Sequence, residues 1–280
     1  MRILASLACV LATATGCLDE ADSIDEHDEG EDSALYEQAY EDGLAEGKTD
    51  GTDCSGVRVP DRSGFGKRIA LTFDDGPNPV TTPKVIDVLK RHGAPAAFFN
   101  NGSRYSVAGA KEVAARIAAD PDYILANHSQ NHLNLAQQTL ARVGSEIDAT
   151  DALVRGAGET PAYFRFPFGS STCAGMKLAR NKGYVVTGWH IDSADWCYAA
   201  GGGVCKRSTF RYVDDALRDN MVGFVVAQAK ANNGGILLMH DIHANTAARL
   251  DDVLTALEQQ GFTFVRLDDR DAFPKLHAAP

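Results

Sequence analysis

Two histidines stand four residues apart in the middle of the chain, in the stretch NHSQNH that contains His128 and His132. On a helical turn this spacing places two side chains on one face, close enough to hold one object between them. Neutral imidazole is the commonest protein ligand for zinc and related metals, so the pair is a candidate metal site. From the spacing alone, two polar loop residues are the simpler interpretation, and a metal site needs a third ligand from elsewhere in the chain.

Two adjacent aspartates, Asp74 and Asp75, follow the apolar run 68–73 and open the stretch DDGP. Neighbouring side chains of an extended chain point in different directions, so one carboxylate can bind a metal while the other acts as a general base. A hydrolytic metal site needs three protein ligands and one open position, and two imidazoles with one carboxylate make such a set. Taken alone, DDGP is also a turn sequence, because Asp, Gly and Pro all favour turns.

Short apolar runs alternate with helical patterns from residue 60 onward. The predicted strands are 68–73, 95–99, 122–126, 162–166, 184–190, 235–239 and 262–266, and the predicted helices are 81–93, 107–119, 135–155, 173–182, 212–231 and 246–260. This alternation predicts parallel strands joined by right-handed crossovers. Either a doubly wound sheet or a TIM-like barrel one strand short satisfies the pattern.

Titratable residues fall repeatedly where a predicted strand ends. They are Asp74 and Asp75 after the first strand, His128 after the third, Arg165 at the end of the fourth, Asp195 after the fifth and His240 at the end of the sixth. Barrel enzymes gather their catalytic groups at these strand ends. The regularity therefore favours a chemical role for the histidines over a plain loop.

The N-terminal region differs in character from the rest of the chain. Residues 1–16 carry one positive charge and an apolar run too short to span a membrane, as a secretory signal peptide does. Small residues before Cys17 resemble a bacterial lipobox, in which this cysteine is lipidated; ordinary cleavage after a small residue is the alternative. Residues 19–53 hold fifteen Asp and Glu against one Lys, so we expect a disordered acidic tether over 17–58.

The remaining residues, 54–280, carry 25 basic and 23 acidic side chains, so the net charge of −11 is a property of the tether. No basic patch interleaved with aromatic residues indicates a nucleic-acid partner. Past the signal peptide, no apolar stretch approaches the roughly 20 residues of a membrane span. We therefore expect membrane contact only through a lipid on Cys17, and a catalytic domain over 59–280.

Cysteine usage fits an exported protein. Six cysteines are present; Cys9 leaves with the signal peptide, and lipidation of Cys17 leaves four, enough for two disulfides. The predicted pairs are Cys197 with Cys205, which flank a glycine-rich loop, and Cys54 with Cys173, which follows by elimination only.

Five stretches together resemble the motifs of the polysaccharide deacetylases, the NodB-homology or carbohydrate esterase 4 family. In family order they are LTFDDGP (71–77), HSQNH (128–132), RFPFG (165–169), DSADW (192–196) and LLMH (237–240), and the resemblance covers about residues 60–270. It implies an α/β fold of the NodB-homology type, a distorted (β/α)7 barrel that is TIM-like and one strand short.

The resemblance also implies roles for the residues around the metal. Asp75, His128 and His132 would bind one divalent ion, with Zn²⁺ favoured and Co²⁺ or another divalent ion as alternatives. Asp74 would be the general base that takes a proton from water. Arg165 would hold Asp74 ionised and oriented, since a nearby positive charge favours the carboxylate.

On the other side of the implied site, His240 would be the general acid and Asp195 would keep it charged. Trp196, Leu238 and Phe168 correspond to the family's substrate pocket, although Leu238 could equally be a core residue. The third motif departs from the family pattern, because Phe168 stands where a tyrosine is usual. The backbone N–H that helps to hold the oxyanion survives this change, whereas a phenolic hydroxyl in the sugar pocket is lost.

These implications predict a metal-dependent hydrolase that removes N-acetyl groups from amino-sugar polysaccharides, either peptidoglycan or chitin-like oligomers. An O-acetyl esterase acting on xylan or a similar glycan is the alternative, and a non-catalytic glycan-binding domain ranks last. We expect an exported protein, tethered as a lipoprotein in the cell envelope or otherwise secreted. The partner is an acetylated glycan; a monomer is favoured, although the sequence does not fix the oligomeric state.

Overall fold

The computed structural model describes residues 65–277. The strands are β1 (Arg68–Asp74), β2 (Ala96–Asn100), β3 (Tyr123–Asn127), β4 (Tyr163–Phe164), β5 (Val185–Val186), β6 (Ile191–Asp192), β7 (Gly235–His240) and β8 (Thr263–Phe264). The α-helices are α2 (Thr82–His92), α3 (Ala110–Ala118), α4 (Leu140–Gly156), α5 (Cys173–Asn181), α6 (Asp195–Ala200), α7 (Met221–Asn232) and α8 (Ala244–Gln259). Short 3-10 helices are η1 (Gly102–Ser106), η2 (Leu135–Gln137), η3 (Pro167–Gly169) and η4 (Asp215–Leu217). The predicted signal peptide, Cys17, the acidic tether and Cys54 lie outside the described residues.

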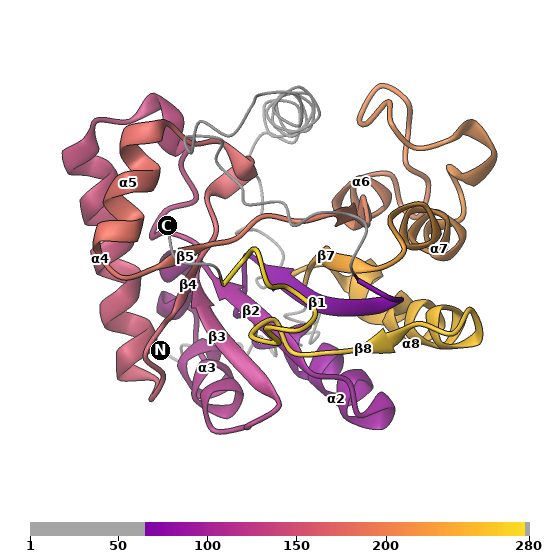
Figure 1. Ribbon diagram of the computed structural model, residues 1–280, viewed down its shortest axis with the longest axis horizontal. Coiled ribbons are helices and arrows are strands. Elements are labelled where there is room, and N and C mark those ends of the chain that lie inside the picture. The colour runs from indigo at the N-terminus through magenta and orange to yellow at the C-terminus, as the bar shows by residue number, and fades with distance from the viewer. Residues whose placement is uncertain (1–64, 278–280) are drawn as a thin grey trace, which may run out of the picture.

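The strands form one parallel sheet in the order β5-β4-β3-β2-β1-β7-β6, and β8 pairs with the first two residues of β1. Helices surround the outer side of the sheet, from α5 and α4 on one flank through α3 and α2 to α8 and α7 on the other (Figure 1). This arrangement confirms the predicted distorted (β/α)7 barrel and decides against the doubly wound alternative. No helix in residues 65–277 has the length and apolar character needed to cross a membrane.

The predicted fifth strand, 184–190, is wrong as a continuous element. Its first part forms β5 beside β4, and the chain then crosses to the other end of the sheet, where β6 pairs with β7. Between them, Thr187 and Gly188 turn their carbonyl groups to the guanidinium of Arg165. The chain between β5 and β6 therefore spans the gap between the two ends of the sheet, and the barrel is left distorted there.

Local capping explains where the helices begin and end. Helix α2 ends at Gly93, whose left-handed backbone (φ 58°) lets its N–H reach the carbonyl groups of Leu89 and Lys90. The predicted helix over 212–231 begins only at Met221, because Asn220 caps it by accepting a hydrogen bond from the N–H of Gly223. Residues 212–220 are turns and η4 instead.

Successive side chains of β1 alternate between the two faces of the sheet. Ile69, Leu71 and Phe73 point toward the helices and join the main apolar cluster, in which Phe73 stacks on Phe98. The intervening side chains face the inside of the barrel, and the last of them is Asp74. The same alternation that builds the core therefore places the carboxylate of Asp74 at the C-terminal end of β1, on the inner face of the barrel.

A disulfide ties α6 to the segment that follows it. The Sγ atoms of Cys197 and Cys205 are bonded at 2.04 Å, in the pairing that the sequence predicts. Arg218 holds the segment from inside by donating hydrogen bonds to the carbonyl groups of Cys205, Phe210 and Val213. The pairing of Cys173 with Cys54 stays a prediction, because Cys54 lies outside the described residues.

Candidate metal centre and active site

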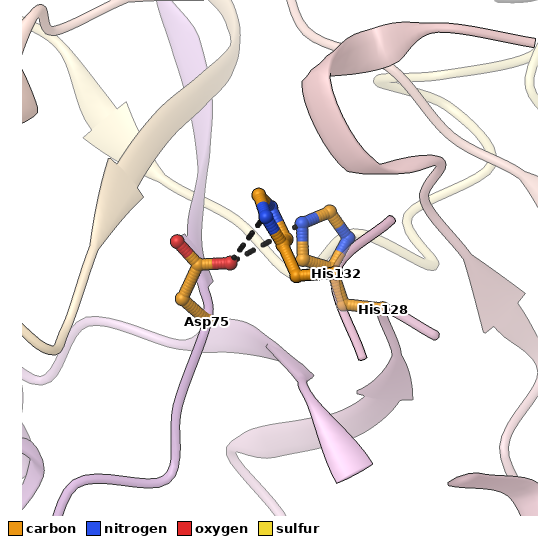
Figure 2. Close-up of side chains that lie close together, drawn as sticks. All are labelled: Asp75, His128 and His132. Carbon is orange, nitrogen blue, oxygen red and sulfur yellow. Dashed lines mark ion pairs between the residues drawn. The ribbon is translucent and has the colours of Figure 1, made fainter. Parts of the chain in front are cut away.

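The three predicted metal ligands meet at one end of the sheet. Asp75 directly follows β1, and His128 and His132 lie in the loop after β3. Oδ1 of Asp75 is 3.4 Å from Nε2 of His128 and 3.2 Å from Nε2 of His132. Figure 2 shows both imidazole rings turned toward this one oxygen.

The geometry fits a bound divalent ion better than direct hydrogen bonding. Bonds of roughly 2.0–2.2 Å to tetrahedral ligands require ligand atoms ~3.3–3.6 Å apart. The separation of 3.4 Å lies within that spacing and the separation of 3.2 Å is slightly below it. One ligand atom from each of Asp75, His128 and His132 lies within 4.8 Å of the other two. Oδ1 of Asp75 is also buried and accepts no hydrogen bond from the described residues. A cation would satisfy this oxygen, so the residues present can hold a metal.

A hydrogen bond behind the site fixes the tautomer of His128. Its Nδ1 lies 2.8 Å from the backbone carbonyl oxygen of Arg165. A carbonyl oxygen only accepts, so Nδ1 carries a proton, and Nε2 is the nitrogen turned toward Asp75 and available to a metal. This is the arrangement that a metal-binding histidine requires.

The backbone around the ligands is unusual. Asp75, Ser129, His132 and Phe168 have positive φ angles of 73°, 70°, 51° and 59°. Residues with a side chain adopt this region rarely, and they cluster at functional sites where the surroundings fix them. Burial would raise the pKa of Asp75, but the charges of His132 and nearby histidines hold it well below its usual range.

Asp74 binds Arg165 with one carboxylate oxygen and turns the other toward His128. Nη1 of Arg165 donates to Oδ1 of Asp74 at 2.6 Å and to Oγ1 of Thr72 at 3.0 Å. The guanidinium is fully buried and lies over the ring of Phe99, with 4.2 Å from Cζ to the ring centroid. Asp74 also lies 3.6 Å from Nε2 of His128, so this buried carboxylate borders the metal centre.

His240 and Asp195 form a second buried pair at the end of the neighbouring strand. In the sheet, His240 on β7 is the register partner of Asp74 on β1. Nδ1 of His240 lies 2.8 Å from Oδ1 of Asp195, whose Oδ2 accepts from the His240 N–H at 2.7 Å and the Thr246 hydroxyl at 2.6 Å. The structure therefore brings the predicted acid and base to the same level of the sheet.

The charges of this pair stabilise each other. Burial by itself would lower the pKa of His240, but the carboxylate of Asp195, with smaller effects from Asp75 and Asp74, raises it to about 10. Burial would raise the pKa of Asp195, but the charge and hydrogen bond of His240 lower it to about 2. The raised pKa favours the imidazolium form of His240, which can donate a proton.

The three predicted pocket residues lie in different surroundings. Phe168 packs against His132, with 4.5 Å between the ring centroids. Trp196 is 9 % exposed and packs edge-on against Phe210 at 5.1 Å. Leu238 is 1 % exposed within β7, as its core interpretation requires. The contact with His132 ties Phe168 to the metal centre, whereas contacts of Trp196 and Leu238 with substrate stay predictions.

Sequence reasoning missed several polar residues that support the site. Thr72 lies within an apolar run of the sequence, yet it accepts a hydrogen bond from Arg165. Asn127 ends β3 and accepts a hydrogen bond from the N–H of Ser129 at 2.9 Å. This bond bends residues 128–132, the histidine loop. Glu146 lies in a predicted helix, where a charged residue among apolar positions is a usable signal.

Comparison with known proteins places this arrangement in context. A family model described as polysaccharide deacetylase matches residues 61–187. A peptidoglycan-N-acetylglucosamine deacetylase of Bacillus cereus is 31 % identical over 72 % of this chain and 87 % of its own length. The peptidoglycan-N-acetylglucosamine deacetylase PgdA of Listeria monocytogenes is 36 % identical over 77 % of this chain, which spans only 41 % of that relative's length.

Solved structures give the same result for the fold. A family 4 carbohydrate esterase from Streptomyces lividans, in complex with acetate, superposes with a TM-score of 0.58 at 27 % identity. The match covers 74 % of this chain and 94 % of the esterase.

Proposed function

Since this chain belongs to the polysaccharide deacetylase family, we propose that it is a metal-dependent hydrolase that removes N-acetyl groups from amino-sugar polysaccharides. The observation that carries the proposal is the convergence of Asp75, His128 and His132 on one point, flanked by two buried ion pairs. We assign the base to one pair, Asp74 with Arg165, and the acid to the other, His240 with Asp195. Hydrolysis of an amide needs all three functions, because water must be activated and a poor amine leaving group must be protonated.

The donor set of the metal centre favours zinc. Two imidazole nitrogens and one carboxylate oxygen match catalytic zinc sites, which keep a fourth position open, and Co²⁺ suits the same ligands. When bound, such an ion would polarise the acetyl carbonyl group and lower the pKa of water to about 7. The protein's part is to hold the three ligands, and the hydrogen bond to Nδ1 of His128 does this for one of them.

Asp74 is the general base of the proposed reaction. It accepts the proton of the attacking water, while the buried Arg165 fixes the orientation of its carboxylate. Oxygen from water bonds to the acetyl carbon, the carbon–nitrogen bond breaks, and His240 donates its proton to the leaving nitrogen. The products are acetate and a free amine on the sugar. The backbone N–H of Phe168 would contribute to holding the oxyanion.

Peptidoglycan is the substrate class that the relatives favour, since the Bacillus and Listeria proteins are named peptidoglycan deacetylases. The test is to incubate the purified chain with N-acetylglucosamine oligomers, peptidoglycan fragments and acetylxylan, and to measure both acetate and new free amines. We expect acetate with an equal amount of amine from the amino-sugar substrates. Acetate from acetylxylan alone would establish the esterase alternative, and no acetate from any substrate would favour a binding domain.

The pH profile should depend on the pair of His240 with Asp195. Because the pKa of His240 is raised, its acidic form persists at neutral pH and is lost only as the pH rises through that raised value. Turnover of an amide should therefore fall on the alkaline side. A bound cation would offset the part of this rise in pKa that Asp75 causes, whereas the part that Asp195 causes would remain. Replacing Asp195 by Asn removes that charge, so the alkaline limb should move down by about 1–3 pH units. An alkaline limb that does not move in Asp195→Asn would show that another group controls it.

The proposed tether gives a separate prediction about location. In a bacterial host, Cys17→Ser should move the protein from the membrane fraction to the soluble fraction, because the lipidated residue is lost. Deacetylase activity per folded molecule should be unchanged, since residue 17 lies outside the proposed catalytic domain. Cys9→Ser, inside the predicted signal peptide, is the matched control and should stay in the membrane fraction. Wild-type protein found entirely in the soluble fraction would contradict the tether.

A further inference from the structure

We infer that Glu146 of helix α4 is a positioning residue for the metal centre, and that it fixes His132 through the intervening Asn131. The inference rests on the proposed metal-dependent function, but it concerns a residue outside the five motifs. It predicts that metal affinity depends on a carboxylate that is neither a ligand nor a proton carrier.

The contact between the helix and the histidine loop is a two-point clamp. Oε2 of Glu146 accepts the backbone N–H of Asn131 at 2.7 Å, and Oε1 accepts its side-chain Nδ2 at 2.7 Å. Hydrogen bonds to an ionised carboxylate are shorter and stronger than those between neutral groups. Two such bonds fix both the main chain and the side chain of the residue that directly precedes His132.

Glu146 occupies a position where the helix would otherwise carry an apolar residue. Its neighbours on the same face of α4, Val143, Ile147, Thr150 and Val154, are all buried, and Glu146 itself is 1 % exposed. A buried charge is costly unless it is paired and hydrogen-bonded. Arg142, one turn earlier, supplies the pairing charge at 2.8 Å, so the carboxylate is stable there.

The histidine loop needs an external support of this kind. Ser129 and His132 both have left-handed backbones, which side-chain-bearing residues adopt only where the surroundings hold them. The first half of the loop is fixed by Asn127 and by η1, whose Gly102 and Ser103 donate to the carbonyl groups of Ser129 and Gln130. The clamp from Glu146 fixes the second half, next to the ligand itself.

The test is zinc affinity, measured by competition with a chelator of known affinity, together with the thermal midpoint of the metal-free protein. Glu146→Gln keeps the size of the side chain but presents an NH₂ group to one of the two Asn131 donors. We expect zinc affinity to fall by about 10–100-fold, the usual effect of losing a partner behind a metal ligand. Glu112→Gln, on the exposed face of α3, is the matched control and should bind zinc as the wild type does.

A rescue variant separates positioning from a general loss of stability. Adding Asn131→Asp to Glu146→Gln reverses one hydrogen bond: the new amide can donate to the new carboxylate and still accept the backbone N–H. We expect the double variant to recover most of the lost affinity, and Asn131→Ala alone to show an intermediate loss. If Glu146→Gln is unfolded at the assay temperature, the zinc affinity of Asn131→Ala relative to wild type is the test instead.

The outcomes distinguish this inference from the proposed function. Wild-type zinc affinity in folded Glu146→Gln would overturn the inference and leave the proposed function standing. Where Glu146→Gln does not fold, wild-type zinc affinity in Asn131→Ala would do the same. An affinity loss that the double variant does not rescue would also overturn it, because the clamp would not be the cause. A wild-type chain that binds no divalent ion would overturn both.

Discussion

Replacing Asp74 by Asn should abolish amide hydrolysis while leaving the metal in place. The amide of Asn has nearly the shape of the carboxylate but cannot take a proton from water. General acid–base groups contribute about 10²–10⁴-fold to rate, and because Asp74 also orients the attacking water we expect the upper part of that range. Metal content should be unchanged, because Asp75, and not Asp74, lies at 3.2–3.4 Å from the histidine nitrogens. The measurements are turnover on an N-acetylated oligomer and elemental analysis of the same sample.

The matched control is Asp75→Asn, one residue along the chain. This variant should lose metal affinity as well as activity, since a neutral amide is a poorer ligand than a carboxylate. Asp74→Asn should stay folded, because Arg165 keeps its bonds to Thr72 and Gly188. Metal loss in Asp74→Asn with metal retention in Asp75→Asn would mean that the two adjacent aspartates have the opposite roles.

The second large effect is expected for His240→Ala, and it should depend on the leaving group. An amide expels a poor amine that must be protonated, so N-deacetylation should fall by about 10²–10⁴-fold. An aryl acetate expels a stabilised phenolate, which needs no proton, and should be affected much less. Turnover of both substrate types is compared in wild type and variant, with metal content checked in each.

His243→Ala provides the control for this experiment. Its ring centroid lies 5.8 Å from that of His240, and His243 precedes α8 without a proposed catalytic role. We expect only a small change on both substrates. Equal losses on amide and aryl ester in His240→Ala would remove His240 from the acid role.

The residues that do chemistry could be located from the sequence because they follow strand ends. Long apolar runs predict β1, β2, β3 and β7, and the structure places Asp75 and His128 directly after two of these strands. A tertiary interaction explains the failure at 184–190. That segment changes partner from β4 to β7, and the guanidinium of Arg165 binds carbonyl groups along the crossing. No local pattern encodes a change of partner.

The support of the site was harder to predict than the site itself. Glu146 and Asn131 are far apart in the sequence, and only the packing of α4 against the histidine loop makes them partners. The periodicity of the helix did carry a signal, because a carboxylate among buried apolar positions requires a partner. The identity of that partner is a property of the folded chain.

The most direct test of the proposed metal-dependent hydrolysis is removal and return of the metal. The purified chain is analysed for bound metals, exhaustively chelated, assayed for acetate release from an N-acetylated oligomer, and assayed again after titration with zinc. We predict one divalent ion per chain at Asp75, His128 and His132, loss of activity on chelation, and recovery that reaches its limit at one equivalent of zinc. Full activity in a chelated sample that elemental analysis finds free of metal would contradict the proposal.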